Sequence, residues 1–161
     1  MIDRPSPNSA RRVRSIRCIV LHSDASPGEE GTLSWLASEK SGVSYHVLIG
    51  RQGTAYRLVS DDRIAYHAGQ AEWRGEQFVN AISLGLAFAH RNDGKEPYTA
   101  EAVDAARVIV AAWCQQYGLD VDAITTHAAV ARPKGRKNDP RDFDLTAFRA
   151  SVQRTLAAAS A

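Results

Sequence analysis

The stretch that decides the fold is 16-IRCIVLHS-23. From Ile16 to Leu21, apolar side chains stand at both odd and even positions. A strand with this pattern is covered on both faces, as at the centre of a sheet that helices flank on both sides. His22 ends the run, and the turn-rich segment SDASPGEEG follows. His22 therefore stands at the border of a rigid strand and a loop, where side chains are held firmly and can still be reached.

The next segments predict a short helix and a hairpin. Thr32 is expected to cap a helix running to about Lys40, with two inward leucines, Leu33 and Leu36. The stretches 44-SYHVLIG-50 and 54-TAYRLV-59 flank Arg51-Gln52-Gly53, a combination typical of a hairpin.

The second half of the chain predicts one more strand and two helices. Residues 61–80 have the composition of a loop, and 81-AISLGLAF-88 predicts another buried strand. Thr99 opens the clearest helix, which Gly118 ends and whose apolar face repeats every three or four residues: Val103, Ala106, Val110, Trp113 and Tyr117. Asp144 is expected to cap a last helix, with Leu145, Phe148, Val152 and Leu156 inward.

The order of these elements predicts the fold class. The series β-α-β-β-β-α-α indicates a single α/β domain with a central mixed β-sheet flanked by helices. The chain has 161 residues, 44% of them hydrophobic, which is enough for a core without disulfides. Residues 1–12 are expected to form an irregular N-terminal arm and residues 13–161 the domain itself. We expect Cys18 and Cys114, in apolar runs, to be buried free thiols.

Charge and hydropathy limit the function. The net charge is only +2, well short of a dedicated nucleic-acid binder. No window approaches the roughly 20 apolar residues that a membrane span needs. The N-terminal stretch lacks the apolar core of a secretory signal, so we expect synthesis in the cytoplasm without a signal peptide.

The stretch 127-HAAVARPKGRKNDP-140 has the least ordinary composition. It combines one histidine, four cations, two prolines, a glycine and an aspartate. Together with His22, its residues His127 and Asp139 make a set of two imidazoles and a carboxylate. Catalytic zinc sites use such three-ligand sets and leave the fourth position to water. Spacing alone leaves a structural role open, because a histidine at a strand end is often structural.

Several segments together carry a family resemblance. In order, across residues 16–148, they are IVLHSDAS, VSYHVLIGRQGTAYRLV, YHAG, NAISLGLAF and HAAVARPKGRKNDP. This series resembles the zinc-dependent N-acetylmuramoyl-L-alanine amidases, which include phage endolysins, bacterial muropeptide amidases and animal peptidoglycan recognition proteins. The resemblance implies that family's fold.

The resemblance also implies roles for single residues. His22, His127 and Asp139 would bind one Zn²⁺ per chain, with aspartate in a position where some phage relatives carry cysteine. Lys137 falls on the family's catalytic lysine, whose ammonium would stabilise the oxyanion of a tetrahedral intermediate. The neighbouring cations, Lys134 and Arg136, are expected to be solvated loop charges.

Tyr45 is the second candidate catalytic residue. On a strand, Tyr45 would share a face with Val47 and Ile49, while His46 would lie on the other face as a packed histidine. Tyr45 matches the catalytic tyrosine of the phage and animal branches. The glutamate that serves as base in bacterial muropeptide amidases is replaced here by Ala87, so the chain resembles the phage type.

Three more residues are candidate substrate contacts. His67 in YHAGQAEW could hydrogen-bond the substrate, Trp73 could form an apolar wall, and Asn80 matches an asparagine that opens the next strand. Other polar residues have simpler explanations. His90 is expected in an exposed turn, and two carboxylates before the last helix are expected to act in capping, Asp142 and Asp144.

By this resemblance, the chain would hydrolyse the amide between the lactyl group of N-acetylmuramic acid and L-alanine of the peptidoglycan stem peptide. The preferred hypothesis is a phage-type endolysin, made in the host cytoplasm and acting on the cell wall after release. The alternatives are a cytoplasmic amidase that recycles muropeptides and a non-catalytic peptidoglycan-binding module. Peptidoglycan or muropeptides are the expected partners, and the chain is expected to be a monomer.

Overall fold

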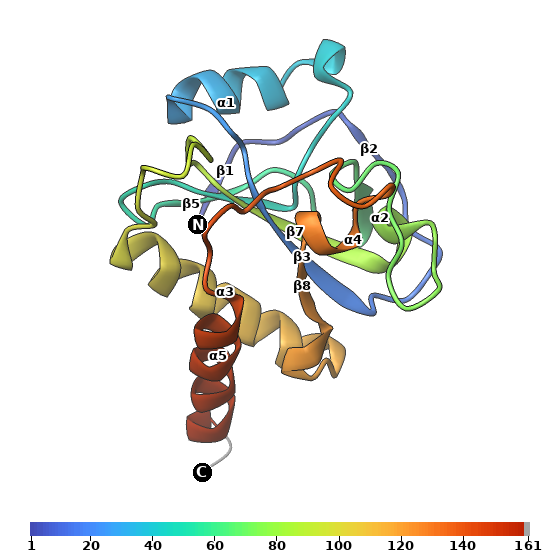
Figure 1. Ribbon diagram of the computed structural model, residues 1–161. Helices are drawn as coiled ribbons and strands as arrows, with labels where there is room; N and C mark the ends of the chain where they lie inside the picture. The colour runs from blue at the N-terminus through green and yellow to red at the C-terminus, as the bar shows by residue number, and fades with distance from the viewer. Residues whose placement is uncertain (160–161) are drawn as a thin grey trace.

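A six-stranded mixed sheet forms the centre of the protein (Figure 1), seen in a computed structural model that describes residues 1–159. Its strand order is β1-β5-β4-β7-β3-β8. β4 and β5 pair antiparallel and the other neighbours are parallel. The strands are β1 (Ile2–Asp3), β3 (Cys18–Ser23), β4 (Val47–Ile49), β5 (Ala55–Arg57), β7 (Ser83–Phe88) and β8 (Ile124–Thr126). The predicted α/β fold with a mixed sheet is confirmed.

The decisive stretch forms β3, and all six of its residues are buried. β3 pairs with β7 over six positions on one side and with β8 on the other, so it is a central strand as predicted. Helices cover both faces of the sheet. Ile19 and Leu21 pack in the same core cluster as α3 (Ala100–Tyr117) and α5 (Leu145–Ala159). α1 (Glu29–Leu36) covers the opposite face (Figure 1).

The long helix α3 has both predicted ends, and α5 begins at its predicted cap. The Thr99 hydroxyl accepts a hydrogen bond from the backbone N–H of Ala102, and Gly118 ends α3 with a φ of 63°. Asp144 caps α5 by accepting from the backbone N–H of Ala147 at 2.8 Å. Both cysteines are buried free thiols, as expected: Cys18 and Cys114.

The prediction for the first helix was wrong at both ends. α1 begins at Glu29, after the N-cap Gly28, and ends at Leu36. Two acidic residues in its first turn favour this start, because negative charge stabilises a helix N-terminus. Thr32 therefore lies inside the helix, where its hydroxyl donates to the carboxylate of Asp24. The inward leucines are buried as predicted.

Several very short elements escaped prediction. The arm of residues 1–12 is not irregular, since it contains β1 and also β2 (Ser9–Arg11), which pairs antiparallel with β6 (Arg63–Ala65). The loop-like stretch 61–80 holds β6 and the first residues of α2 (Val79–Ile82). The predicted loop at 127–140 begins with one helical turn, α4 (His127–Val130). Elements of two to four residues are too short to show periodicity, and the short strands among them depend on distant pairing partners.

No helix within residues 1–159 is long and apolar enough to cross a membrane.

Candidate metal centre

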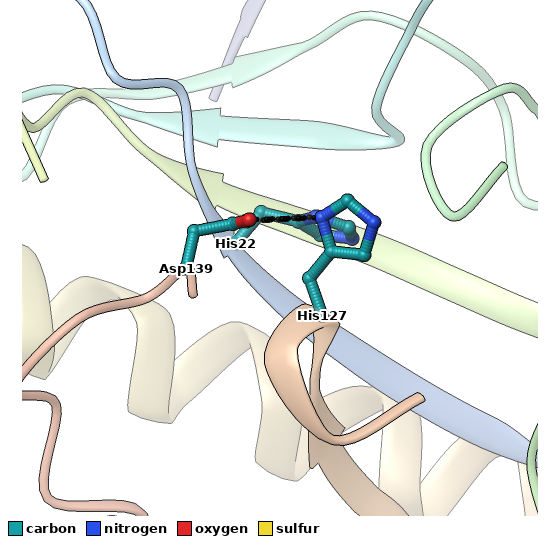
Figure 2. A group of neighbouring side chains, drawn as sticks. All are labelled: His22, His127 and Asp139. Carbon is teal, nitrogen blue, oxygen red and sulfur yellow. Dashed lines mark hydrogen bonds and ion pairs between the residues drawn. The ribbon is translucent and has the colours of Figure 1, made fainter. Parts of the chain in front are cut away.

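Three buried side chains meet at the carboxyl edge of the central sheet (Figure 2). His22 stands near the end of β3, and His127 directly follows β8. β3 and β8 are parallel neighbours, so their carboxyl ends lie side by side and bring the two imidazoles together. Asp139 reaches them from the loop before α5, and one ligand atom from each residue lies within 4.8 Å of the others. The structure thus brings together residues that lie over a hundred positions apart.

The donor atoms of this triad fit a cation. Nδ1 of His127 lies 3.0 Å from Oδ1 of Asp139, and Nδ1 of His22 lies 3.4 Å from Oδ2. Within residues 1–159, His22 Nδ1 is the one buried side-chain nitrogen or oxygen that has no hydrogen-bond partner. Leaving such an atom unpaired is costly, and a bound metal ion removes that cost. Two imidazole nitrogens and a carboxylate oxygen are also a donor set that zinc prefers.

Burial keeps His22 neutral. It lowers the pKa of His22 to about 4, although the nearby carboxylate of Asp139 acts in the opposite direction. Burial alone would raise the pKa of Asp139, but the two neighbouring imidazoles, His127 and His22, lower it below its ordinary value. At neutral pH the site therefore offers an ionised carboxylate beside an imidazole with a free lone pair, as metal binding requires.

The Nε2 atoms of His22 and His127 both contact the loop that contains His67 and Ala68. Nε2 of His127 lies 3.2 Å from the carbonyl oxygen of Ala68, to which it donates. Its Nδ1 is then an acceptor that faces a carboxylate, an arrangement that a cation between them stabilises. Nε2 of His22 lies 2.9 Å from Nδ1 of His67.

Tyr45 lies beside His22, but the prediction that it shares a strand face with Val47 and Ile49 was wrong. Its ring centroid is 5.1 Å from that of His22. Tyr45 packs with the cluster that includes Leu48, whereas Val47 and Ile49 pack on the opposite side of the sheet. β4 begins only at Val47, and the backbone bends at His46, so strand alternation does not extend back to Tyr45. Burial raises the pKa of Tyr45 above its ordinary value, so the phenol is protonated.

His46 is a packed residue, as predicted. It is fully buried, its Nδ1 accepts from the backbone N–H of Gly85, and its Nε2 contacts the carbonyl oxygen of Arg63. Ala87 pairs with His22 in the parallel register of β3 and β7. Paired residues point to the same face of a sheet, so a longer side chain at Ala87 would extend toward the metal site.

A cavity of about 250 Å³ opens beside the triad. His127 lines it together with three predicted site residues, His67, Asn80 and Lys137. Three other cavities, of about 490, 450 and 380 Å³, are larger, but none of them is lined by a triad residue. We place the site by its ligand chemistry and not by cavity size.

The cations of the 127–140 stretch have different surroundings. Lys137 is exposed and lines the cavity. Arg136 is not a freely solvated charge, because its guanidinium donates to the carbonyl oxygens of Arg132, Ala68 and Gln70. Lys134 is exposed, as expected.

Of the three predicted substrate contacts, Asn80 and His67 line the cavity beside the triad and Trp73 does not. Asn80 lines the cavity, and its Oδ1 accepts the backbone N–H groups of His67 and Ala68. His67 is only 7% exposed. Trp73 is 8% exposed in a core cluster, and the guanidinium of Arg74 lies 4.6 Å from its ring centroid. The substrate contact of Trp73 stays a prediction.

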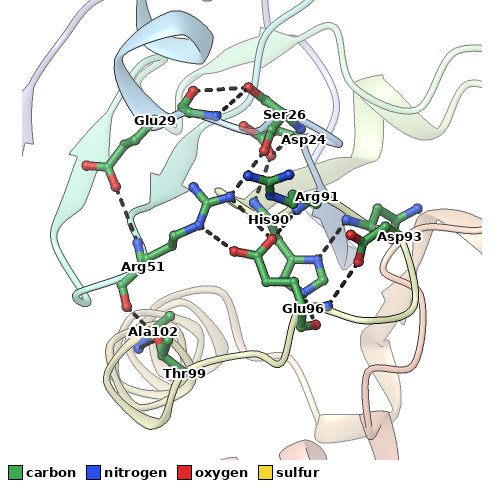
Figure 3. Close-up of polar contacts among 12 residues, drawn as sticks. Asp24, Ser26, Glu29, Arg51, His90, Arg91, Asp93, Glu96, Thr99 and Ala102 are labelled. Carbon is green, nitrogen blue, oxygen red and sulfur yellow. Dashed lines mark hydrogen bonds and ion pairs between the residues drawn. The ribbon is translucent and has the colours of Figure 1, made fainter.

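His90 was wrongly expected in an exposed turn. It is buried, stacks on Tyr98 with ring centroids 4.0 Å apart, and bonds the carbonyl oxygen of Glu96 through Nε2 at 2.7 Å. Its backbone N–H donates to Asp24, which follows β3 (Figure 3). Arg51, from the β4–β5 hairpin, binds Glu96 in the same network. These contacts tie together the loops at the edge of the sheet that carries the triad.

The loop after β7 also supports the third ligand. The side-chain amide of Asn92 donates to Asn138 at 2.9 Å and accepts from the backbone N–H of Arg141 at 2.7 Å. The hydroxyl of Tyr98 lies within hydrogen-bond distance of Ser23 and donates to the carbonyl oxygen of Arg141. Sequence reasoning missed these residues, because their partners lie more than forty positions away.

Fold and site together define a class of protein: an α/β domain whose central sheet carries, at its carboxyl edge, a His-His-Asp cluster that could hold a metal ion. The chain belongs to the N-acetylmuramoyl-L-alanine amidase family, whose model matches residues 12–142. This family is zinc-dependent in general.

Among curated proteins, the chain is similar to the 1,6-anhydro-N-acetylmuramyl-L-alanine amidase AmpD of Salmonella typhimurium strain SL1344. The two are 31% identical over 113 residues, which cover 68% of this chain and 57% of AmpD. The chain thus matches little more than half the length of this curated relative.

Solved structures show the same fold. A selenomethionine AmpD structure superposes with a TM-score of 0.77 at 26% identity, covering 93% of both chains. The amidase AmiD of E. coli, solved in complex with anhydro-N-acetylmuramic acid-L-Ala-D-γ-Glu-L-Lys, gives a TM-score of 0.70 at 23% identity. It covers 84% of this chain and 53% of AmiD.

Proposed function

We propose that this chain is a zinc-dependent amidase that hydrolyses the bond between the lactyl group of N-acetylmuramic acid and L-alanine of the stem peptide. The observation that carries this proposal is the unpartnered, buried Nδ1 of His22, which faces Asp139 beside His127 in a chain of this family. His22, His127 and Asp139 would hold one Zn²⁺ per chain. When bound, zinc acts as a Lewis acid and lowers the pKa of bound water to about 7.

The residues around the triad suit amide hydrolysis. The cavity beside His127 leaves room for the scissile amide, and Lys137 lies on its wall. The ammonium of Lys137 would stabilise the negative charge that develops on the carbonyl oxygen. The protonated hydroxyl of Tyr45 would orient the attacking water by hydrogen bonding. Hydrolysis adds the elements of water: the lactyl group leaves as a carboxylate and the stem peptide as an amine.

For the biological role, we propose an endolysin-type enzyme that cleaves polymeric peptidoglycan, reached after release from the cytoplasm where the chain is made. Support comes from Tyr45 in the site and from Ala87 in place of the glutamate of the bacterial muropeptide enzymes. The second candidate is recycling of soluble anhydro-muropeptides, which the similarity to AmpD favours. A binding module without catalysis has less support, because all three ligand positions are intact.

One experiment separates these functions. Zinc-loaded protein is incubated in parallel with intact sacculi and with soluble anhydro-muropeptides, and released stem peptides are measured by mass spectrometry. Faster release from sacculi supports the endolysin type, and faster release from the soluble substrate supports recycling. Zinc-loaded protein that cleaves neither substrate would refute amidase activity.

A further inference from the structure

We propose that His67 positions the metal ligand His22, by accepting the Nε2 proton of His22 and so directing the lone pair of its Nδ1 toward the metal. This inference rests on the metal site of the proposed function. It gives His67 a supporting role on the protein side of the site, in place of the predicted contact with substrate.

Val79, Ser83, His67 and His22 form a series of hydrogen bonds, and the contact between Ser83 and Val79 fixes which atom donates in each of them. The hydroxyl of Ser83 lies 2.6 Å from the carbonyl oxygen of Val79. A carbonyl oxygen only accepts, so the single hydroxyl proton of Ser83 is used in this bond. Nε2 of His67 lies 3.1 Å from the same hydroxyl oxygen. This nitrogen must therefore carry a proton and donate it to Ser83.

The same logic continues to the metal ligand. A buried, neutral imidazole carries one ring proton, so Nδ1 of His67 is an acceptor. It lies 2.9 Å from Nε2 of His22, which must then be the protonated nitrogen of His22. Nδ1 of His22 is left with a free lone pair, and it is the atom without a hydrogen-bond partner within residues 1–159. The series from Val79 to His22 thus ends in one lone pair aimed at the metal.

The backbone around His67 is shaped to hold its ring. A Cβ at Gly85, in the middle of β7, would come within 2.6 to 2.9 Å of three atoms of the His67 ring. Only glycine therefore lets the imidazole lie against the strand. Asn80 fixes the backbone on the other side by accepting the N–H groups of His67 and Ala68. Because both ring nitrogens of His67 are bonded within the protein, neither is free for a substrate.

Zinc affinity tests the proposal without any substrate. Zinc-loaded protein is titrated with a chelator of known affinity, and wild type is compared with His67→Phe and His67→Gln. His67→Phe fills the space without an acceptor and should weaken zinc binding about tenfold to a hundredfold, as is typical when the partner of a metal-ligating histidine is removed. His67→Gln offers an amide oxygen to His22 and should restore most of the affinity. Tyr66→Phe, which alters a neighbour lining the same cavity, should bind zinc as wild type does.

A second measurement keeps the test valid if His67→Phe does not fold. Nitrogen-15 NMR of the zinc-loaded wild-type protein should show both His22 and His67 protonated on Nε2. Ser83→Ala, which removes the acceptor for His67, should weaken zinc binding less than His67→Phe does.

Two results would overturn the role of His67 and leave the proposed function standing. One is a proton on Nδ1 of His67, and the other is a folded His67→Phe variant with wild-type zinc affinity and a raised KM. A wild-type chain that binds no zinc would overturn the proposed function as well.

Discussion

Substituting Gly85 by alanine should weaken zinc binding although Gly85 touches no ligand. The added Cβ would lie 2.6 Å from Cγ of His67. Carbon atoms in contact prefer about 3.5 to 4.0 Å, so the ring must move by about 1 Å. The bonds of His67 to His22 and Ser83 measure 2.9 and 3.1 Å. A shift of that size along either bond takes it beyond the usual limit of about 3.2 Å.

Gly85→Ala should lower zinc affinity about tenfold to a hundredfold, the usual effect when a metal-ligating histidine loses its hydrogen-bond partner. This factor equals about 1.4 to 2.8 kcal/mol of binding free energy. Overpacking should also lower the free energy of unfolding of the metal-free chain by about 1 to 3 kcal/mol. Chelator competition measures the first effect, and urea unfolding in excess chelator measures the second.

Gly31→Ala is the matched control, because a Cβ at Gly31 in α1 would meet no atom within 4 Å. It should leave zinc affinity unchanged and stabilise the helix by about 0.5 to 1 kcal/mol. A double variant, Gly85→Ala with His67→Ala, should lose no more affinity than His67→Ala alone, since the clash then has no target. A folded Gly85→Ala protein that binds zinc like wild type would refute the reasoning.

Three further predictions test the site itself. Asp139→Ala should lose most of the one zinc per chain that metal analysis finds in wild type, and full retention would remove Asp139 from the ligand set. Lys137→Ala should keep zinc but release stem peptides about a hundred- to a thousandfold more slowly, as when an oxyanion donor is lost; wild-type rates would contradict its role. Burial lowers the pKa of His22 to about 4 and that of His46 to about 3. Below the unfolded value of about 6.5, unfolding takes up these protons. The free energy of unfolding of the metal-free chain should thus fall by about 1.4 kcal/mol per residue and pH unit as the pH drops from 6.5 toward these values. Urea titrations in chelator at several pH values measure this slope, and a flat profile would show that both rings are protonated in the folded chain.

The sequence predicted those elements whose pattern of apolar residues extends over many positions. The apolar run before His22 became the central strand, and the three- and four-residue spacing after Thr99 became α3. The triad was recognisable because its members resemble a family motif. Elements of two to four residues were missed, since their stability comes from pairing with distant segments, as β2 pairs with β6.

Side-chain orientation was less predictable than position. Strand alternation failed at Tyr45 because the backbone bends before β4 begins. The partner of His22 was missed because the contact joins residues 45 positions apart. Ser83 looked like an ordinary strand residue, although its hydroxyl is the group that sets the direction of the hydrogen bonds.

One short loop, which contains His67 and Ala68, contacts both imidazoles of the triad. His67 accepts the Nε2 proton of His22, and the carbonyl oxygen of the next residue, Ala68, accepts that of His127. Each contact uses the nitrogen that faces away from Asp139, so both Nδ1 atoms face the carboxylate. Arg136, from the stretch that carries the third ligand, also donates to the carbonyl oxygen of Ala68. The segment YHAG lines the cavity beside His127, and two of its residues, His67 and Ala68, also contact the triad imidazoles on the side away from Asp139. A change at His67 should therefore alter zinc affinity before it alters recognition of the stem peptide.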